Sequence, residues 1–306
     1  MLPAAAAAQV PPAPAPVQGT LTLKAQKVMR DGPRRVALTR MSWRVRGELR
    51  PFVPGQTVVV RFFRNGRQVR EQTEQLRSVR GGAAGEFLTP FRSRSAGRVV
   101  VSAVHLATPE LDTVRSEKVR VNVMTPVIGG AVTRLLQKGL AKMKYAVTRT
   151  GVYDDATARA VMAYRKVNGM PRSYYASESI VRRVLAGKGA FKPKYPGDGR
   201  HVEADLSRQV LALVNPRGRV HRVYHTSTGA PATPTVIGRF RVYRKSIGTN
   251  ARGMVHSSYF IRGYAIHGYP SVPAYNASHG CLRVPIPNAW SIYEWVRMGT
   301  VVRVYP

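Results

Sequence analysis

Two short stretches near the C-terminus carry most of the chemical information in this chain: residues 264–268 read YAIHG and residues 277–284 read ASHGCLRV. They bring Cys281, the one cysteine of the chain, close to His267 and His279. A thiol attacks a carbonyl as its thiolate, and a nearby histidine can lower the thiol pKa and relay the proton. A glycine directly before the cysteine allows a tight backbone that can aim N–H groups at an oxyanion. The pattern predicts a cysteine nucleophile with a histidine base.

Both histidines are candidates for the base. His279 lies two residues from Cys281, about 6.5 Å away if the segment is extended, but the intervening glycine favours a bend. His267 belongs to a separate predicted strand and can approach the sulfur across a sheet, with the main chain at Gly268 orienting its ring. We therefore expect His267 to be the base.

Two other interpretations of this cluster compete with catalysis. His267, His279 and Cys281 are residue types that bind zinc, but they lack paired ligand spacing and an evident fourth ligand. A free cysteine is also often a buried, inert side chain. Glycines at 268 and 280 pack poorly in a core, which favours a reactive site. We expect no metal and no cofactor.

The region around the cluster, residues 201–306, reads as a mostly antiparallel β domain with one prominent helix. Runs at 209–214 and 219–225 flank an Asn-Pro-Arg-Gly turn, which predicts a hairpin. The helix is expected at 287–298, where apolar residues recur at helical spacing. Further strands are expected at 238–245, 255–261, 264–267 and 300–305.

Two more structured regions precede this domain. Residues 130–187 show helical periodicity, with Asp154 as a candidate N-cap, and predict a compact three-helix unit followed by a Gly/Pro-rich linker at 188–200. Residues 19–126 predict an immunoglobulin-like β-sandwich, with Asn65-Gly66 as a hairpin turn. We expect the Pro/Ala-rich residues 1–18 to be disordered.

The net charge of the chain gives information about its binding partners rather than about its fold. The 306 residues carry a formal net charge of +34, spread along the whole sequence. No nucleic-acid-binding motif accompanies it, so an anionic surface such as a cell wall is favoured over nucleic acid, with background composition as the third alternative. No apolar run is long enough to span a membrane. Small-residue A-x-A triplets near the start suit the end of an export signal or a linker.

Two family resemblances follow from these motifs. IHG with SHGCLR resembles the YkuD-type L,D-transpeptidase signature, and the segment from Thr226 to Phe240 resembles the S-T-G…T-P-T-x-G-x-F stretch of that family. Residues 136–169 (LQ, GVYD, T, AV, NG) resemble the peptidoglycan-binding domain family, with Arg165 where many members carry glutamine.

The transpeptidase resemblance implies a reaction and a site. Cys281 would attack the third residue of a peptidoglycan stem peptide, releasing D-alanine, and the thioester would pass to a neighbouring amine as a 3→3 cross-link. His267 would move the proton, and carbapenem-type β-lactams would act as covalent inhibitors. The resemblance also implies export to the periplasm or cell wall. The remaining site residues that it implies are Gly268, Ser278, His279 and Gly280 for catalysis and Tyr259, Tyr264 and Arg283 for substrate binding. The backbone N–H groups of Gly280 and Cys281 are the two candidate oxyanion donors.

Two alternatives remain at this point. The same site could hydrolyse stem peptides as an L,D-carboxypeptidase or endopeptidase, because the acceptor site is not a short motif. A non-catalytic wall-binding protein is the other alternative, and the intact His/Cys set argues against it.

Overall fold

The computed structural model describes residues 15–306 and divides them into two compact units, one ending at Thr125 and the other running from Pro126 to Pro306. The expected disorder of residues 1–14 lies outside the described residues. At Val17 that expectation is corrected: its N–H donates to the carbonyl of Glu110, and its carbonyl accepts from Asp112, both at 3.1 Å. Backbone groups make this pairing, so the lack of apolar side chains does not prevent it.

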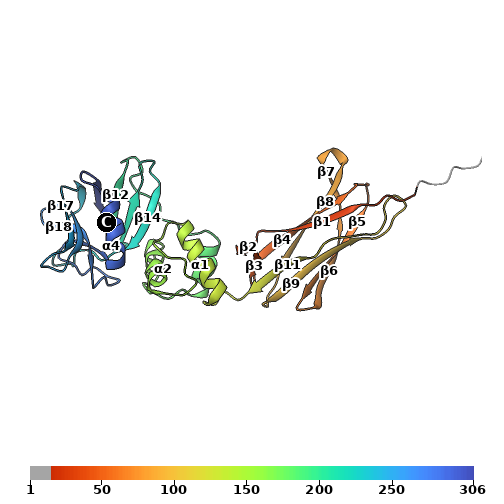
Figure 1. The fold of residues 1–306 in the computed structure, drawn as a ribbon, viewed down its shortest axis with the longest axis horizontal. Helices are drawn as coiled ribbons and strands as arrows, with labels where there is room; N and C mark the ends of the chain where they lie inside the picture. The colour runs from red at the N-terminus through yellow and green to blue at the C-terminus, as the bar shows by residue number, and fades with distance from the viewer. Residues whose placement is uncertain (1–14) are drawn as a thin grey trace, which may run out of the picture. The chain divides into compact units, whose positions relative to one another are not determined.

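The first unit consists of two β-sheets around one core (Figure 1). One sheet has the order β1 (Thr20–Gln26), β4 (Ser42–Arg50), β8 (Ala84–Arg92), β7 (Arg77–Val79). The other has the order β2 (Met29–Asp31), β3 (Arg34–Leu38), β11 (Val119–Met124), β9 (Gly97–His105), β5 (Thr57–Arg64), β6 (Arg67–Gln75), with β10 (Val114–Arg115) on β9.

Alternation of buried and exposed residues explains how the two sheets meet. Along β4, every second residue from Trp43 is buried. The Trp43 ring lies 5.2 Å from Phe91 of its own sheet and 6.4 Å from Phe62 of the other. The hairpin predicted at Asn65-Gly66 is confirmed: both residues have positive φ, as a type I′ turn needs. The immunoglobulin-like assignment stays a prediction.

The second unit begins with three helices, α1 (Gly130–Lys142), α2 (Asp155–Val167) and α3 (Glu178–Leu185). The predicted cap is confirmed, because Asp154 accepts a 2.8 Å hydrogen bond from the N–H of Thr157. Helix α2 packs against β13 (Val210–Val214) and β14 (Val220–His225) of the C-terminal region, next to α1 (Figure 1). That the helices fold on their own stays a prediction.

A buried lysine, Lys166, fixes α2 against strands β13 and β14. The ammonium nitrogen of Lys166 lies 2.8 Å from Nδ1 of His225, 3.1 Å from the carbonyl of Gln209 and 2.9 Å from the carbonyl of Thr226. When Lys166 is protonated, its ammonium has three donors and no acceptor, so these three partners satisfy it. Burial lowers the pKa of Lys166 to about 6. The contact sets the position of α2 on β13 and β14.

The C-terminal region contains two sheets and one helix. The first sheet has the order β14, β13, β12 (His201–Asp205), β20 (Val301–Tyr305), β15 (Gly238–Arg241), and the second has the order β16 (Arg244–Thr249), β17 (Val255–Ile261), β18 (Tyr264–Tyr269), β19 (Leu282–Pro285). Helix α4 (Ile286–Trp295) packs on β17, β18 and β19. Both sheets and α4 contribute to one core.

Two predicted elements of this region need adjustment. The strand expected at 238–245 is two strands, because the chain crosses from β20 to β17 at Val242 and Tyr243, whose N–H groups bond Thr300 and Tyr259. The helix expected at 287–298 ends sooner, since Val296 is already extended. The expected mostly antiparallel arrangement is confirmed: five strand pairs of this region are antiparallel, and only β12–β20 and β18–β19 are parallel.

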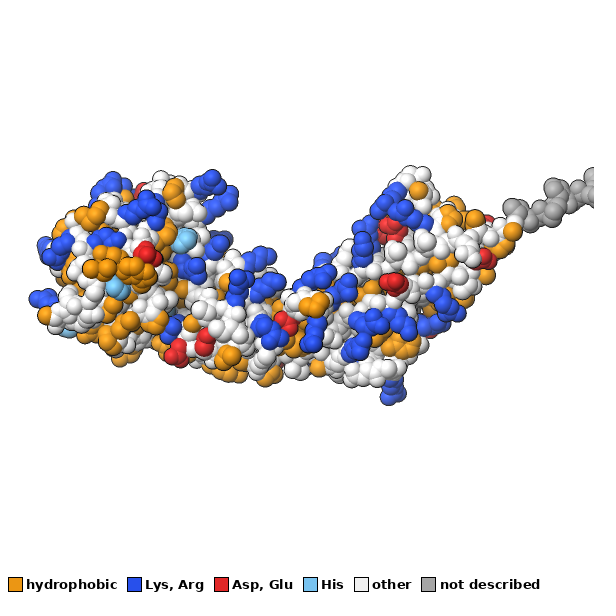
Figure 2. All heavy atoms as spheres, in the orientation of Figure 1, with side chains coloured by type: hydrophobic (Ala, Val, Ile, Leu, Met, Phe, Trp, Pro, Cys, Tyr) orange, Lys and Arg blue, Asp and Glu red, His pale blue; other side chains and the backbone are white. Residues whose placement is uncertain are grey.

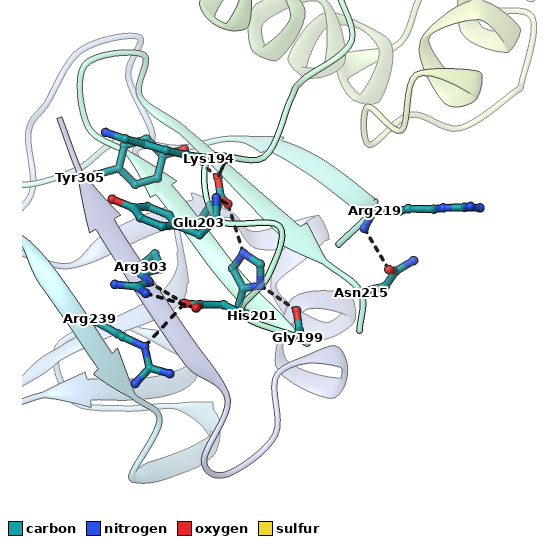
Figure 3. A network of polar contacts seen from close by, with 11 residues as sticks. Lys194, Gly199, His201, Glu203, Asn215, Arg219, Arg239, Arg303 and Tyr305 are labelled. Carbon is teal, nitrogen blue, oxygen red and sulfur yellow. Dashed lines mark hydrogen bonds and ion pairs between the residues drawn. The ribbon is translucent and has the colours of Figure 1, made fainter. Parts of the chain in front are cut away.

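The chain before β12, residues 188–200, is held down by a buried polar network (Figure 3). Glu203 accepts hydrogen bonds from the N–H groups of Lys194 and Tyr195, from the hydroxyl of Tyr305 and from Nε2 of His201. Asp198 pairs with Arg303 and Arg239. The predicted linker thus contains no helix or strand but is fastened to β12, β20 and β15.

Basic side chains are present along both units. Figure 2 shows Lys and Arg spread over both units on the face in view, with few Asp or Glu. No helix among residues 15–306 is long and apolar enough to cross a membrane.

Candidate active site

The parallel pairing of β18 and β19 brings the predicted base and nucleophile into one pocket. His267 lies opposite Arg283 in the register, and Cys281 directly precedes β19. Residues two apart on a strand face the same side, so His267 and Tyr269 share a side, as do Cys281 and Arg283. The pocket encloses about 230 Å³ and is lined by Arg252, Met254, Gly263, Tyr264, His267, Tyr269, Ser278, His279, Cys281 and Arg283.

The ring of His267 is oriented by its neighbour in the chain. Its Nδ1 lies 2.9 Å from the carbonyl oxygen of Gly268. A carbonyl only accepts, so the neutral ring carries its proton on Nδ1 and leaves Nε2 as an acceptor. Burial lowers the pKa of His267 to about 4, and the charge of Arg283 acts in the same direction. The ring is therefore neutral near pH 7 and able to take a proton.

The surroundings of the Cys281 thiol favour its protonated form. Burial raises its pKa, although a hydrogen bond to the main chain of Ala265 and the charges of Arg283 and Arg252 act in the opposite direction. The expectation that a histidine lowers this pKa is therefore corrected. A neutral imidazole supplies no positive charge, and the sulfur packs against Met254, Tyr259 and Ala265.

The loop before the cysteine uses one of the two predicted oxyanion donors for its own structure. The Ser278 hydroxyl accepts from the N–H of Gly280 at 3.1 Å and donates to the carbonyl of Cys281 at 2.7 Å. Because the Gly280 N–H is engaged, its assignment as an oxyanion donor is corrected. The N–H of Cys281 stays the candidate donor. Ser278, which is buried, closes the turn that presents the nucleophile.

The upstream segment of the motif supports this loop from behind. The carbonyl of Thr228 accepts from the N–H groups of Ala277 and Ser278, both at 2.9 Å. Ser227 and Arg283 exchange two backbone hydrogen bonds, and the N–H of Ala230 donates to the carbonyl of Ser278. The two motifs, far apart in sequence, thus form one supporting frame for Cys281.

The remaining predicted residues take different places. His279 lines the pocket with an exposed side chain, and Arg283 stacks its guanidinium 4.1 Å from the centre of the Tyr269 ring. Tyr264 also lines the pocket. Tyr259 does not line it, which corrects its assignment to substrate binding: its ring is buried beside Ala265, its register partner on β18. Tyr259 therefore supports the thiol from within the core.

Sequence reasoning missed four lining residues, Arg252, Met254, Gly263 and Tyr269. Tyr269 directly follows His267-Gly268, so strand alternation could have placed it beside the histidine. Arg252 lies in a turn between β16 and β17 and carries no pattern of its own. Among residues 15–306, no three His, Cys, Asp or Glu side chains gather as a metal site requires.

Comparison with known proteins places this geometry in a family. The model of the YkuD L,D-transpeptidase catalytic domain matches residues 199–304. The crystal structure of the L,D-transpeptidase from Xylanimonas cellulosilytica (residues 123–326) is 32% identical and aligns with 56% of this chain and 92% of that chain, with a TM-score of 0.52. The chain belongs to the L,D-transpeptidase family. It is therefore a transpeptidase of the bacterial cell wall.

More distant solved structures also match this L,D-transpeptidase. The enzyme from Stackebrandtia nassauensis is 21% identical over 58% of this chain and 92% of that chain, with a TM-score of 0.37. The enzyme from Mycobacterium smegmatis is 14% identical over 92% of this chain and 100% of that chain, with a TM-score of 0.32. No curated protein matches the sequence.

Proposed function

We propose that this L,D-transpeptidase forms 3→3 cross-links between peptidoglycan stem peptides through a thioester on Cys281. One observation carries the proposal: His267, with Nδ1 bound to Gly268 and Nε2 available, lines the same pocket as the only thiol of the chain. A neutral base beside a protonated thiol suits proton transfer during attack rather than a preformed ion pair.

The acylation step follows from these groups. The Cys281 sulfur attacks the carbonyl of the third stem residue, a diamino acid, while Nε2 of His267 takes the thiol proton. The N–H of Cys281 stabilises the oxyanion. His267 then gives the proton to the nitrogen of the departing D-alanine as the C–N bond breaks. The products are a thioester on Cys281 and free D-alanine.

Transfer reverses the roles. The side-chain amine of a neighbouring stem attacks the thioester, and His267 takes a proton from that amine. The C–S bond breaks, and the sulfur regains the proton from His267. Arg283 and Arg252 line the pocket and suit binding of substrate carboxylates, because guanidinium groups pair with carboxylates through two hydrogen bonds.

Mass spectrometry of purified tetrapeptide stems incubated with the full chain tests this function. We expect a dimer whose mass equals two stems minus one D-alanine. A shortened monomer alone would instead identify a hydrolase, either an L,D-carboxypeptidase or an endopeptidase. No change, in parent and Cys281→Ser alike, would leave a non-catalytic wall-binding protein.

Other parts of the chain suit work at the wall. We propose export to the periplasm or cell wall, where the substrate lies, and retention on peptidoglycan through residues 130–187. The N-terminal unit adds a basic hollow of about 420 Å³. Its lining comes mainly from the neighbouring strands β3, β11 and β9 and comprises Pro33, Arg34, Arg35, Arg98, Lys118, Arg120 and Asn122. Five cations and no acidic side chain in this lining suit an anionic wall polymer.

A further inference from the structure

A second pocket lies between α2 and the catalytic sheets, directly beside the Cys281 pocket. It encloses about 520 Å³. Tyr269 lines both pockets, and its ring meets the His267 ring edge-on at 5.7 Å. The other lining residues are Asp155, Ala158, Arg159, Tyr174, His225, Pro270, Val272, Pro285, Ile286 and Pro287. A molecule bound here would be separated from a substrate on Cys281 by one aromatic ring.

The polar groups of this second pocket are suited to binding and not to catalysis. Nδ1 of His225 is engaged by Lys166 and Nε2 by the carbonyl of Val272 at 2.8 Å. Burial, followed by the charge of Lys166, lowers the pKa of His225 to about 3. The His225 ring therefore lines the pocket as a neutral group that two hydrogen bonds hold in place. Arg159 differs, because its Nε is buried and has no hydrogen-bond partner among the described residues. A ligand oxygen would give the Arg159 guanidinium an acceptor.

The apolar part of the lining presents flat faces. Tyr174 is 43% exposed, and three prolines and Tyr269 complete a surface of rings. The C–H faces of a pyranose ring pack on such surfaces, while its hydroxyl and acetamido groups bond to side chains at their edges. Asp155 and Arg159 provide one acceptor and one donor group, and their charges cancel. The pocket therefore favours a neutral polar ring over an anion or an amine.

Helix α2 holds this surface ready before any ligand binds. Asp155, Ala158 and Arg159 stand at i, i+3 and i+4, which places them on one face of the helix. The contact of Lys166 with Gln209, Thr226 and His225 sets the position of that face next to β13 and β14. A pocket of this size lies within the range of 300–1,000 Å³ that is usual for small ligands.

We propose that this pocket binds the glycan of the substrate strand, as a unit of N-acetylated amino sugars, while the stem peptide occupies the Cys281 pocket. The inference rests on the proposed function, because only a substrate that joins sugar to peptide fills both pockets. It assigns Arg159 and Tyr174 to sugar binding and gives α2 a direct part in substrate recognition.

Direct binding provides the first test, with chitotetraose as a neutral amino-sugar probe and Cys281→Ser as the protein. We expect Arg159→Gln and Tyr174→Ala each to weaken binding about tenfold, the scale of one lost hydrogen bond or ring contact. Matched controls are Arg149→Gln, an exposed arginine outside the pocket, and Tyr175→Ala, the exposed neighbour of Tyr174. Equal losses in variants and controls, or no binding by the parent, would overturn the proposal.

Acylation kinetics provide the second test and separate this proposal from the proposed function. We expect Arg159→Gln and Tyr174→Ala to raise KM for a disaccharide-tetrapeptide about tenfold and to leave the sugar-free tetrapeptide unchanged. Equal effects on both substrates would mean that the two residues only support the fold, and no effect on either would mean that the pocket is unused. If the parent acylates with neither substrate, the proposed function fails, whereas chitotetraose binding still decides the role of the pocket.

Discussion

Gly280 lies so close to Tyr264 that a Cβ added to the glycine would stand 2.5 Å from Cε1 of the tyrosine ring. The same glycine has φ of +105°, a backbone conformation that other residues rarely adopt. Both constraints act on the residue before the nucleophile, so the position of Cys281 depends on the absence of a side chain at 280.

Substitution of Gly280 by alanine is expected to impair acylation more than it lowers stability. Gly248 offers a matched control, because its φ is +80° but nothing lies within 4 Å of an added Cβ. Both variants carry a backbone cost of about 1–2 kcal/mol, and only Gly280→Ala also displaces Tyr264. Urea denaturation and acylation by a β-lactam measure the two effects. Equal acylation by both variants would contradict the proposed role of the close approach.

The reactivity of the thiol toward iodoacetamide should rise with pH beyond the ordinary thiol pKa of 9.0, because burial raises the pKa of Cys281. The free thiol is not paired with a charged histidine, so His267→Ala should change this profile little. An inflection well below pH 7 in the parent, lost in His267→Ala, would mean that a thiolate–imidazolium pair exists at rest.

Much of this site could be predicted from sequence, because strand alternation and the order of motif residues determine which side chains share a face. His267 and Cys281 followed from that logic. The protonated thiol did not, since it depends on packing by Met254, Tyr259 and Ala265 from elements whose register the sequence does not reveal. The engagement of Gly280 by Ser278 likewise depends on a turn that only the folded loop defines.

In the fold, too, some features could be predicted from the sequence and others could not. Hairpins and caps with local signals, such as Asn65-Gly66 and Asp154, were predictable from a few residues. The parallel pairs β12–β20 and β18–β19 join distant segments, and no local pattern specifies such partners. The Lys166 contact was missed because a lysine on a helix normally faces solvent.

The buried pair of His201 and Glu203 predicts a pH-dependent stability. Burial acts against both charges, but hydrogen bonds between them and to the main chain prevail, so the pKa of His201 is raised and the pKa of Glu203 is lowered. The contribution of the charged His201 imidazole to the free energy of unfolding is complete below its ordinary pKa of 6.5. It is lost as pH rises through the raised pKa of the folded protein. The contribution of the Glu203 carboxylate to the free energy of unfolding is complete above its ordinary pKa of 4.5. It is lost as pH falls through the lowered pKa of the folded protein.

Glu203→Gln should therefore cost most at about pH 5.5, on the order of 3–5 kcal/mol, and less at about pH 9. Glu178→Gln, which removes an exposed pair with Arg182, is the control and should cost at most about 1 kcal/mol at either pH. Urea denaturation at the two pH values measures both. A cost for Glu203→Gln that does not change with pH would show that the pair is not ionised in the folded protein.

The basic hollow of the N-terminal unit predicts salt-sensitive binding to a poly(glycerol phosphate) wall polymer. Screening lengths shrink from about 10 Å at 0.1 M salt to about 3 Å at 1 M, so binding should fall steeply over that range. The double variant Arg98→Gln/Arg120→Gln should bind more weakly than Arg77→Gln/Arg94→Gln, which removes two exposed arginines outside the hollow. If both double variants bound the polymer equally, or if the parent bound DNA as well as the polymer, the net charge would attract polyanions without a specific site in the hollow.

The rate at which a carbapenem-type β-lactam acylates Cys281 in His267→Ala and in His279→Ala tests the central claim most directly. Intact mass at pH 7 reports the adduct, and Cys281→Ala, which should form none, is the control. General-base catalysis contributes about 10²–10⁴-fold, so His267→Ala should acylate at least about 100-fold more slowly than the parent. His279→Ala should stay within about tenfold, because its exposed ring contacts substrate at most. Acylation that is unchanged in His267→Ala and lost in His279→Ala would contradict the assignment of His267 as the base.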